Sequence, residues 1–122
     1  MSACEPSLGA PPPTGQATNR LLSVQVIRDE HRVAITPIGD VDMSTAGKLD
    51  DAIRAAEATD AKRIVIDLSE VTFMDSTGLK LVLEAGARAR ANSNRLRLIR
   101  GSRRVQRVFE LTKTEEILPF LD

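Results

Sequence analysis

Aromatic, Cys and His side chains are scarce in this sequence, and their scarcity excludes several classes of function. Trp and Tyr are absent and Phe occurs three times in 122 residues, so the stacking platforms that hold single-stranded nucleic acid are missing. One Cys and one His cannot supply a disulfide framework, a Cys/His zinc site or most His-based triads. We therefore expect no metal and no cofactor, and a function that rests on other chemistry.

Net charge and long apolar runs are also lacking. Lys and Arg total 17, as do Asp and Glu, so the formal net charge is zero and a globally basic nucleic-acid-binding protein is disfavoured. No apolar run approaches the roughly 20 residues of a membrane helix, and residues 1–20 lack the basic start and apolar core of a secretory signal. These absences favour a cytoplasmic protein that contacts neither nucleic acid nor a membrane directly.

The chain nevertheless has enough apolar residues, 42%, to bury the core of one domain. Residues 1–20 contain four Pro and two Gly and too little apolar surface to offset the entropy lost on ordering. We therefore predict a flexible tail over residues 1–20 and one folded domain over residues 21–122. Cys4 lies in the tail, where nothing nearby would activate its thiol, so we interpret it as incidental.

Hydrophobic periodicity predicts alternating strands and helices in the folded domain. A hairpin is expected first, with strands over about 22–26 and 33–38. The apolar run 64–68 is typical of a central strand covered on both faces, and 96–99 predicts another strand. Because Pro37 cannot donate to a strand ladder, we expect it at a strand end or a bulge.

Three helices are predicted between and after these strands. The first covers about 45–58 with Ser44 as its N-cap, the second covers 76–91 after a loop over 69–75, and Ser102 caps the third. The residues expected to face the core are Ala46, Leu49, Ile53, Ala56, Leu79, Val82, Leu83, Val105, Val108 and Phe109. A hairpin whose second strand begins a βαβαβα order predicts an α/β domain with a small mixed sheet and helices packed mainly on one face.

Positive charge is concentrated toward the C-terminus. Residues 21–87 carry 12 acidic and 7 basic side chains, whereas residues 88–122 carry 4 acidic and 9 basic ones. From Arg88 to Arg107, eight arginines occur with no acidic residue among them. They could form a docking surface for an acidic partner or a nucleic-acid backbone. We favour the simpler interpretation, that they solvate the outer faces of a strand and two helices.

The most informative stretch is 73–79, Phe-Met-Asp-Ser-Thr-Gly-Leu, which leads into the second predicted helix. Asp75 or Ser76 can cap the first turn, and capping alone would explain either residue. The hydroxyls of Ser76 and Thr77 are expected at an accessible position, where a sheet meets the start of a helix. Because a helix N-terminus favours negative charge, a phosphate on Ser76 would be compatible with the fold.

This stretch closely resembles the phosphorylation motif of STAS-domain anti-sigma factor antagonists, in which a D-S-[ST]-G-L turn leads into the second helix. A second segment, Gly39-Asp40-Val41-Asp42 followed by Thr45-Ala46, is similar to the G-[ED]-[ILV]-D-x-x-x-A segment of that family. The two segments occur in the expected order, and the resemblance covers residues 21–122. It implies a STAS-like domain that acts as a regulator and is not an enzyme.

The resemblance also implies a phosphorylation cycle. An anti-sigma factor that is an ATP-using serine kinase would phosphorylate Ser76, with Thr77 as a secondary candidate. The unphosphorylated protein, expected to be a monomer or weak dimer, would bind the anti-sigma factor and free a sigma factor. A PP2C-type phosphatase would reset the cycle. The residues expected to bind the partner are Asp42, Met43, Ser44, Met74, Asp75, Ser76, Thr77, Gly78 and Lys80.

Two other functions compete with this interpretation. The first is a STAS scaffold subunit of a transporter or a stressosome-type assembly, without a phosphorylation switch. The second is a small hydrolase or nucleotide-binding enzyme with Ser76 as its nucleophile, which would need a general base. The single His, His31, lies in a distant predicted turn, and a carboxylate from Asp42 or Asp75 is poorly matched to activating a serine near neutral pH. We therefore favour the antagonist.

Overall fold

The computed structural model describes residues 21–121, so the tail predicted over residues 1–20, with Cys4, lies outside the described residues. Residues 21–121 form five strands, three α-helices and one 3-10 helix. In chain order these elements are β2 (Leu22–Arg28), β3 (Arg32–Val41), α2 (Ala46–Glu57), β4 (Arg63–Asp67), β5 (Val71–Met74), α3 (Ser76–Ala91), β6 (Leu96–Ile99), α4 (Arg103–Leu111) and η1 (Glu115–Ile117). The predicted α/β class is confirmed.

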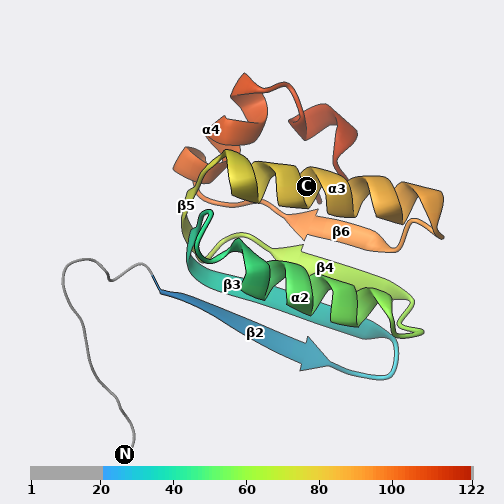
Figure 1. The fold of residues 1–122 in the computed structure, drawn as a ribbon. Coiled ribbons are helices and arrows are strands. Elements are labelled where there is room, and N and C mark those ends of the chain that lie inside the picture. The colour runs from blue at the N-terminus through green and yellow to red at the C-terminus, as the bar shows by residue number, and fades with distance from the viewer. Residues whose placement is uncertain (1–20, 122) are drawn as a thin grey trace, which may run out of the picture.

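The five strands form one mixed sheet in the order β2-β3-β4-β6, with β5 paired to β3 (Figure 1). β2 and β3 are the predicted antiparallel hairpin. β4 pairs in parallel with residues 32–35 of β3, and β5 pairs in parallel with residues 39–41. The segment that forms β5 was predicted as part of a loop. That prediction was wrong because a four-residue strand between turn residues leaves too short a pattern to identify.

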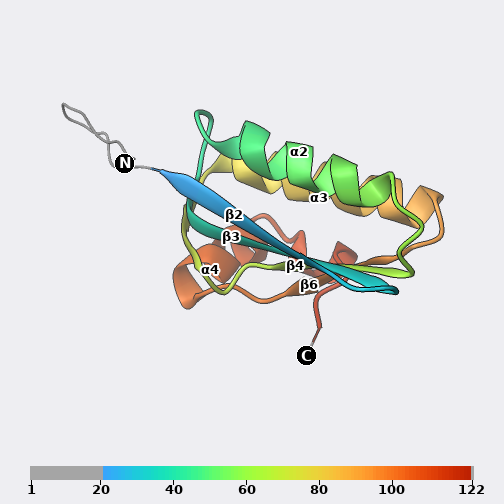
Figure 2. The same cartoon turned by 90° about the horizontal axis from the view of Figure 1, so that it is seen from below.

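The two long helices lie side by side on one face of the sheet, as Figure 2 shows. Within residues 21–121 no helix covers the other face, and α4 lies at the sheet edge beyond β6. β4 was predicted to be covered on both faces. This prediction is wrong in that helices cover only one face of the strand. Val65, which points away from α2 and α3, is nevertheless only 8% exposed, and it lines a shallow depression with Arg32, Arg97 and Leu121.

Pro37 lies in the middle of β3 and not at its end. The backbone N–H of Gly39 donates to the carbonyl of Glu70, on the β4 and β5 side of β3. Since alternate residues of a strand face the same neighbour, the nitrogen of Pro37 also faces that side. There the pairing with β4 ends at Ile35 and the pairing with β5 begins at Gly39. Proline is accommodated because no strand at this position requires its missing donor.

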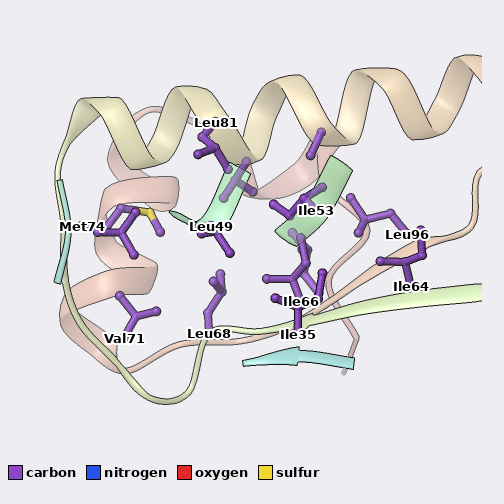
Figure 3. Packing of buried hydrophobic residues seen from close by; sticks show 14 of the residues in the cluster. Ile35, Leu49, Ile53, Ile64, Ile66, Leu68, Val71, Met74, Leu81 and Leu96 are labelled. Carbon is purple, nitrogen blue, oxygen red and sulfur yellow. The ribbon is translucent and has the colours of Figure 1, made fainter. Parts of the chain in front are cut away.

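The hydrophobic core fills the space between the helices and the sheet. Figure 3 shows Leu49 and Ile53 of α2 directed toward Ile35 of β3 and Ile66 of β4. All four residues predicted to form the apolar stripe of α2 are buried. This packing orients α2 on the sheet and thereby places the turn that precedes it.

The core face of α3 is broader than predicted. Val82 is fully buried as expected, whereas Leu79 and Leu83 are partly buried, and Leu81 and Ala85 are buried in addition. The cause is that α3 packs beside α2 as well as on β5, and a single periodic stripe does not reveal a helix covered on two sides.

The third helix begins as predicted, with the Ser102 hydroxyl accepting a hydrogen bond from the backbone N–H of Val105 at 3.4 Å. Val105 and Phe109 are fully buried, and Val108 is half-buried. The Phe109 ring meets Phe120 edge to face, with ring centroids 5.2 Å apart. α4 therefore packs beside β5 and against the C-terminal segment that contains Phe120.

Candidate functional site

A bulge in β3 brings two distant segments of the chain together. The register between β3 and β5 shifts between Gly39 and Asp40, and Gly39 has φ +121°, a conformation that favours glycine. After the bulge, Val41 pairs with Met74, and the N–H of Asp75 donates to the carbonyl of Val41 at 3.2 Å. The chain leaving β3 toward α2 therefore lies beside the chain entering α3.

The N-terminus of α3 is capped by Asp75. Its Oδ1 accepts hydrogen bonds from the backbone N–H groups of Thr77, at 2.8 Å, and Gly78, at 3.2 Å. Of the two capping residues that the sequence allowed, the structure therefore selects Asp75. Ser76 is the first residue of the helix and is exposed, while Thr77 is half-buried. Helix capping therefore accounts for the presence of Asp75 at this position. It does not account for the exposed hydroxyl of Ser76.

Gly78 lets the first turn of α3 approach the end of β3. A Cβ at this position would lie 2.8 Å from Met74 Cγ and 2.9 Å from Val41 Cγ1, which is closer than side chains pack. Gly78 is buried and Met74 is 3% exposed. These two predicted partner-binding residues are therefore not on the surface. They support the site from beneath, because apolar side chains at the end of a strand pack into the core.

The turn between β3 and α2 is organised by Asp42. Its Oδ1 accepts from the Ser44 hydroxyl at 2.7 Å and from the N–H groups of Ser44 and Thr45 at 2.9 and 3.2 Å. The hydrogen bond from the Ser44 hydroxyl, followed by the backbone N–H donors, holds the pKa of Asp42 below its ordinary value. Ser44 was predicted to cap α2. Instead its hydroxyl donates to Asp42, and the cap residue is Thr45 without a side-chain cap.

Exposed and half-buried residues of these two segments form one surface, which we call the Ser76 surface. Its members are Asp42, Met43, Ser44, Ser76, Thr77 and Lys80. Met43 is 82% exposed although it is apolar. Met43, Thr77 and Lys80 also line a shallow groove between α2 and α3. An exposed methionine beside a groove is typical of a surface that contacts another protein.

The one histidine of the chain lies far from Ser76. His31 precedes the ten-residue β3, and at about 3.3 Å per residue roughly 30 Å separate it from the site at the other end of the strand. The Oδ1 of Asp75 is already hydrogen-bonded to two backbone N–H groups. Among residues 21–121, no three His, Cys, Asp or Glu side chains gather where they could hold a metal ion.

The arginines of the C-terminal part do not form one surface. Arg95 donates to the carbonyls of Glu57, Thr59 and Ala61, and Arg100 forms an ion pair with Glu115 at 2.9 Å. Arg103, Arg104 and Arg107 are exposed on α4. The sequence does not distinguish these roles, because hydrogen bonds to backbone carbonyls leave no pattern in the residue types. Separately, no helix within residues 21–121 has the length and apolar character needed to cross a membrane.

The sequence is similar to a known protein family and to several named proteins. A family model described as Mlab, STAS domain matches residues 24–119. The anti-sigma-B factor antagonist of Listeria monocytogenes is 34% identical over 91 residues, which are 75% of this chain and 80% of that protein. The anti-sigma-F factor antagonist RsfB of Mycobacterium tuberculosis is 40% identical over 57 residues, 46% of this chain and 47% of that protein.

A solved structure agrees with the observed fold over most of the domain. The crystal structure of an anti-sigma factor antagonist from Mycobacterium paratuberculosis superposes with a TM-score of 0.75 at 25% sequence identity. The match covers 86% of this chain and 89% of the other. The mixed sheet with two helices on one face is therefore a fold that the two proteins share.

Proposed function

The chain belongs to the STAS-domain family, and from this premise we propose that it is an anti-sigma factor antagonist. In the unphosphorylated form it binds an anti-sigma factor and thereby frees a sigma factor. The relatives named as antagonists support this role. The domain acts as a binding partner, and the chemistry of the switch belongs to other proteins.

The observation that carries the proposed switch is the exposed Ser76 at the first turn of α3, beside the exposed Met43–Ser44 turn. The partner anti-sigma factor is a serine kinase. The Ser76 hydroxyl oxygen attacks the γ-phosphorus of ATP, the new O–P bond forms as the bond to ADP breaks, and a base on the kinase takes the hydroxyl proton. A PP2C-type phosphatase hydrolyses the phosphoserine and restores the hydroxyl.

A phosphate on Ser76 changes the surface and leaves the fold intact. The N–H groups of Thr77 and Gly78 are already satisfied by Asp75, so the phosphate stays outside the cap. The positive end of the helix dipole favours its charge. Phosphorylation adds about −1.5 to −2 charges to a surface that already contains Asp42. A partner complementary to the neutral hydroxyl loses contacts and meets like charge, which weakens binding.

The site assignment is tested by phosphorylation in vitro. The protein is incubated with its anti-sigma factor and Mg-ATP, and intact mass is measured for the wild type, Ser76→Ala and Thr77→Ala. We expect the wild type and Thr77→Ala to gain one phosphate and Ser76→Ala to gain none. Equal modification of Ser76→Ala would refute Ser76 as the acceptor.

The effect of charge is tested by affinity for the anti-sigma factor, measured by calorimetry. Ser76→Asp is expected to weaken binding by about tenfold or more, which corresponds to about 1.4 kcal/mol. The matched control is Ser93→Asp, which introduces the same charge at an exposed residue just beyond the C-terminus of α3, and the helix itself is about 22 Å long from Ser76 to Ala91. Equal weakening by both variants would show that net charge and not the Ser76 surface controls binding.

A scaffold subunit of a transporter or stressosome-type assembly is the second candidate, because the matching family is described by the name Mlab and not as antagonists. This function predicts that Ser76→Ala and Ser76→Asp behave alike in cells. It also predicts that the tagged protein co-purifies with membrane ATPase components in place of an anti-sigma factor. The antagonist predicts the opposite results in both experiments.

A further inference from the structure

A shallow depression lies on the face of the sheet that α2 and α3 leave open, which is the lower face in Figure 2. β3, β4 and β6 direct apolar residues toward the helices. Because successive side chains of a strand point to opposite faces, Arg32, Arg63 and Arg97 point to the open face. The residues that line the depression, which we call the basic depression, are Asp29, His31, Arg32, Lys62, Arg63, Val65, Arg97 and Leu121.

The arginines of the basic depression lie next to one another across neighbouring strands. Arg32 of β3 is paired in register with Arg63 of β4. Arg97 of β6 is paired with Val65, two residues after Arg63 on the same face. Like charges opposite each other on neighbouring strands are unfavourable, and within residues 21–121 no carboxylate forms an ion pair with these arginines or with Lys62. A group of cations without an internal partner indicates that a negatively charged ligand binds there.

Acidic side chains near the depression do not balance its charge. Asp29 is the one carboxylate that lines it, and its Oδ1 accepts from the backbone N–H groups of His31 and Arg32 at 2.8 Å. Glu30 and Asp67 are close in the chain but do not line the depression. With His31 neutral, four cationic side chains and one carboxylate give the depression a net charge of +3. A negatively charged ligand is therefore attracted to this end of the sheet.

The size of the depression indicates a ligand with several negative charges. Neighbouring strands lie about 4.8 Å apart, so the arginines on β3, β4 and β6 span about 10 Å across the sheet. The depression has a volume of ≈ 460 Å³, whereas one water occupies roughly 10–15 Å³ in the same measure. A single small anion would leave most of it empty. Val65 and Leu121 add apolar surface, so the ligand should combine separated anionic groups with apolar ones.

We propose that the basic depression binds an acidic segment of another protein, in which carboxylates alternate with apolar side chains. The carboxylates accept from the guanidinium groups of Arg63 and Arg97, whose geometry they match, and the apolar side chains contact Val65 and Leu121. Nucleic acid fits less well, because no aromatic side chain among the described residues lines the depression and could stack on a base.

This binding site goes beyond the proposed phosphorylation switch and does not depend on it. The ten-residue strand β3 separates the basic depression from the Ser76 surface, a distance of roughly 30 Å. The acidic segment can therefore bind while the Ser76 surface is occupied by the anti-sigma factor. Ser76→Asp should accordingly bind the segment like the wild type, so failure of the switch and failure of this site are distinguishable.

The proposal is tested by NMR titration of the full chain with two capped peptides, Glu-Val-Glu-Val-Glu and Gln-Val-Gln-Val-Gln, which have nearly the same shape. We expect the acidic peptide to cause saturable shifts of the Arg63, Val65 and Arg97 amides. The dissociation constant of the neutral peptide should be at least tenfold higher, because charge-assisted hydrogen bonds are stronger than neutral ones. Equal affinity for both peptides would overturn the proposal, as would shifts centred on the exposed arginines of α4.

Two further probes distinguish a protein partner from other polyanions. A thymidine hexanucleotide and inorganic triphosphate are titrated under the same conditions and at the same salt concentration. We expect both to bind more weakly than the acidic peptide, because neither places apolar groups on Val65 and Leu121. If either probe binds these residues more tightly than the peptide, the proposed acidic segment is wrong.

Substitutions assign the interaction to the arginines of the sheet. Arg63→Gln and Arg97→Gln should each weaken binding of the acidic peptide at least fivefold. The control Arg104→Gln, at an exposed residue of α4, changes the net charge equally and should leave the affinity unchanged. Equal weakening by Arg63→Gln and Arg104→Gln would show that net charge alone controls binding and would overturn the proposal.

Thermal melting separates a binding role of Arg63 from a structural one. Arg63→Gln should melt no lower than the wild type, because the substitution removes the like-charge pair with Arg32. A variant that melts lower while its affinity for the acidic peptide is unchanged would identify Arg63 as structural and would overturn the assignment.

Discussion

The two ends of α3 use polar side chains in opposite ways. At the Ser76 end, backbone bonds and small residues hold the structure, and the exposed hydroxyl of Ser76 makes no contribution to the helix cap. At the other end, which we call the arginine end, Arg88 of α3 and Arg95, just before β6, bind the end of α2 and the loop that follows it, through the Glu57 carboxylate and backbone carbonyls. Side chains there are structural.

This difference explains how a regulatory residue can be modified without unfolding the domain. A side chain that bears no part of the packing can gain a phosphate at little cost in stability. Its backbone stays in place because Asp75 N–H is bonded to Val41 and because Gly78 fits against Met74. The contrast predicts that equivalent changes at the two ends differ in their effect on the free energy of unfolding.

The largest effect is expected at the arginine end, from Arg95→Ala. The substitution removes three hydrogen bonds to the carbonyls of Glu57, Thr59 and Ala61, and it should lower the free energy of unfolding by about 3 kcal/mol. Urea denaturation with linear extrapolation measures it. The control Arg104→Ala, exposed on α4, should stay within about 0.5 kcal/mol. If Arg95→Ala and Arg104→Ala lower the free energy of unfolding equally, Arg95 has no special structural role and the two ends of α3 do not differ in this way.

A smaller loss is expected from Asp75→Ala, which removes the N-cap of α3 and should cost about 1 kcal/mol. Thermal or urea unfolding measures the loss. Asp75→Asn should restore most of it, because asparagine also accepts from the first-turn N–H groups. If Asp75→Ala leaves the free energy of unfolding unchanged, the Ser76 surface is not held by this cap.

Asp42 should make a pH-dependent contribution to the free energy of unfolding. We expect this contribution to be smaller than the loss caused by Asp75→Ala. Because its folded pKa is depressed, this stability is present above the unfolded pKa of about 3.9 and is lost as the pH falls through the lower folded pKa. An NMR titration of the Ser44 and Thr45 amides follows the carboxyl group. Ser44→Ala should raise the pKa of Asp42, since the Ser44 hydroxyl is the largest cause of its depression. An unchanged titration in that variant would contradict the proposed turn.

The smallest effect on stability is expected from Ser76→Asp. An exposed residue at the first position of a helix accepts negative charge readily, so the free energy of unfolding should change by less than about 0.5 kcal/mol. Calorimetric melting of this variant beside the wild type tests the contrast most sharply. A variant that melts far below the wild type would show that Ser76 is structural, and the switch would then have to act through unfolding.

The sequence alone determined the elements whose signal is local. Apolar spacing identified α2, α3 and α4, because each helix buries a stripe that repeats along its own length. The Asp-Ser-Thr-Gly turn was recognisable because capping chemistry is confined to a few adjacent residues. The predicted partner-binding set, by contrast, included Met74 and Gly78, and their burial depends on the end of β3, more than 30 residues earlier in the chain.

The tertiary structure decided everything that rests on pairing between distant segments. The bulge at Gly39, the short strand β5 and the open position of Pro37 follow from strand register, which no single segment encodes. The separate roles of the arginines depend on which carbonyl groups lie within reach after folding. Local periodicity is a property of one stretch of chain, whereas hydrogen bonds across the sheet exist only once two stretches have met.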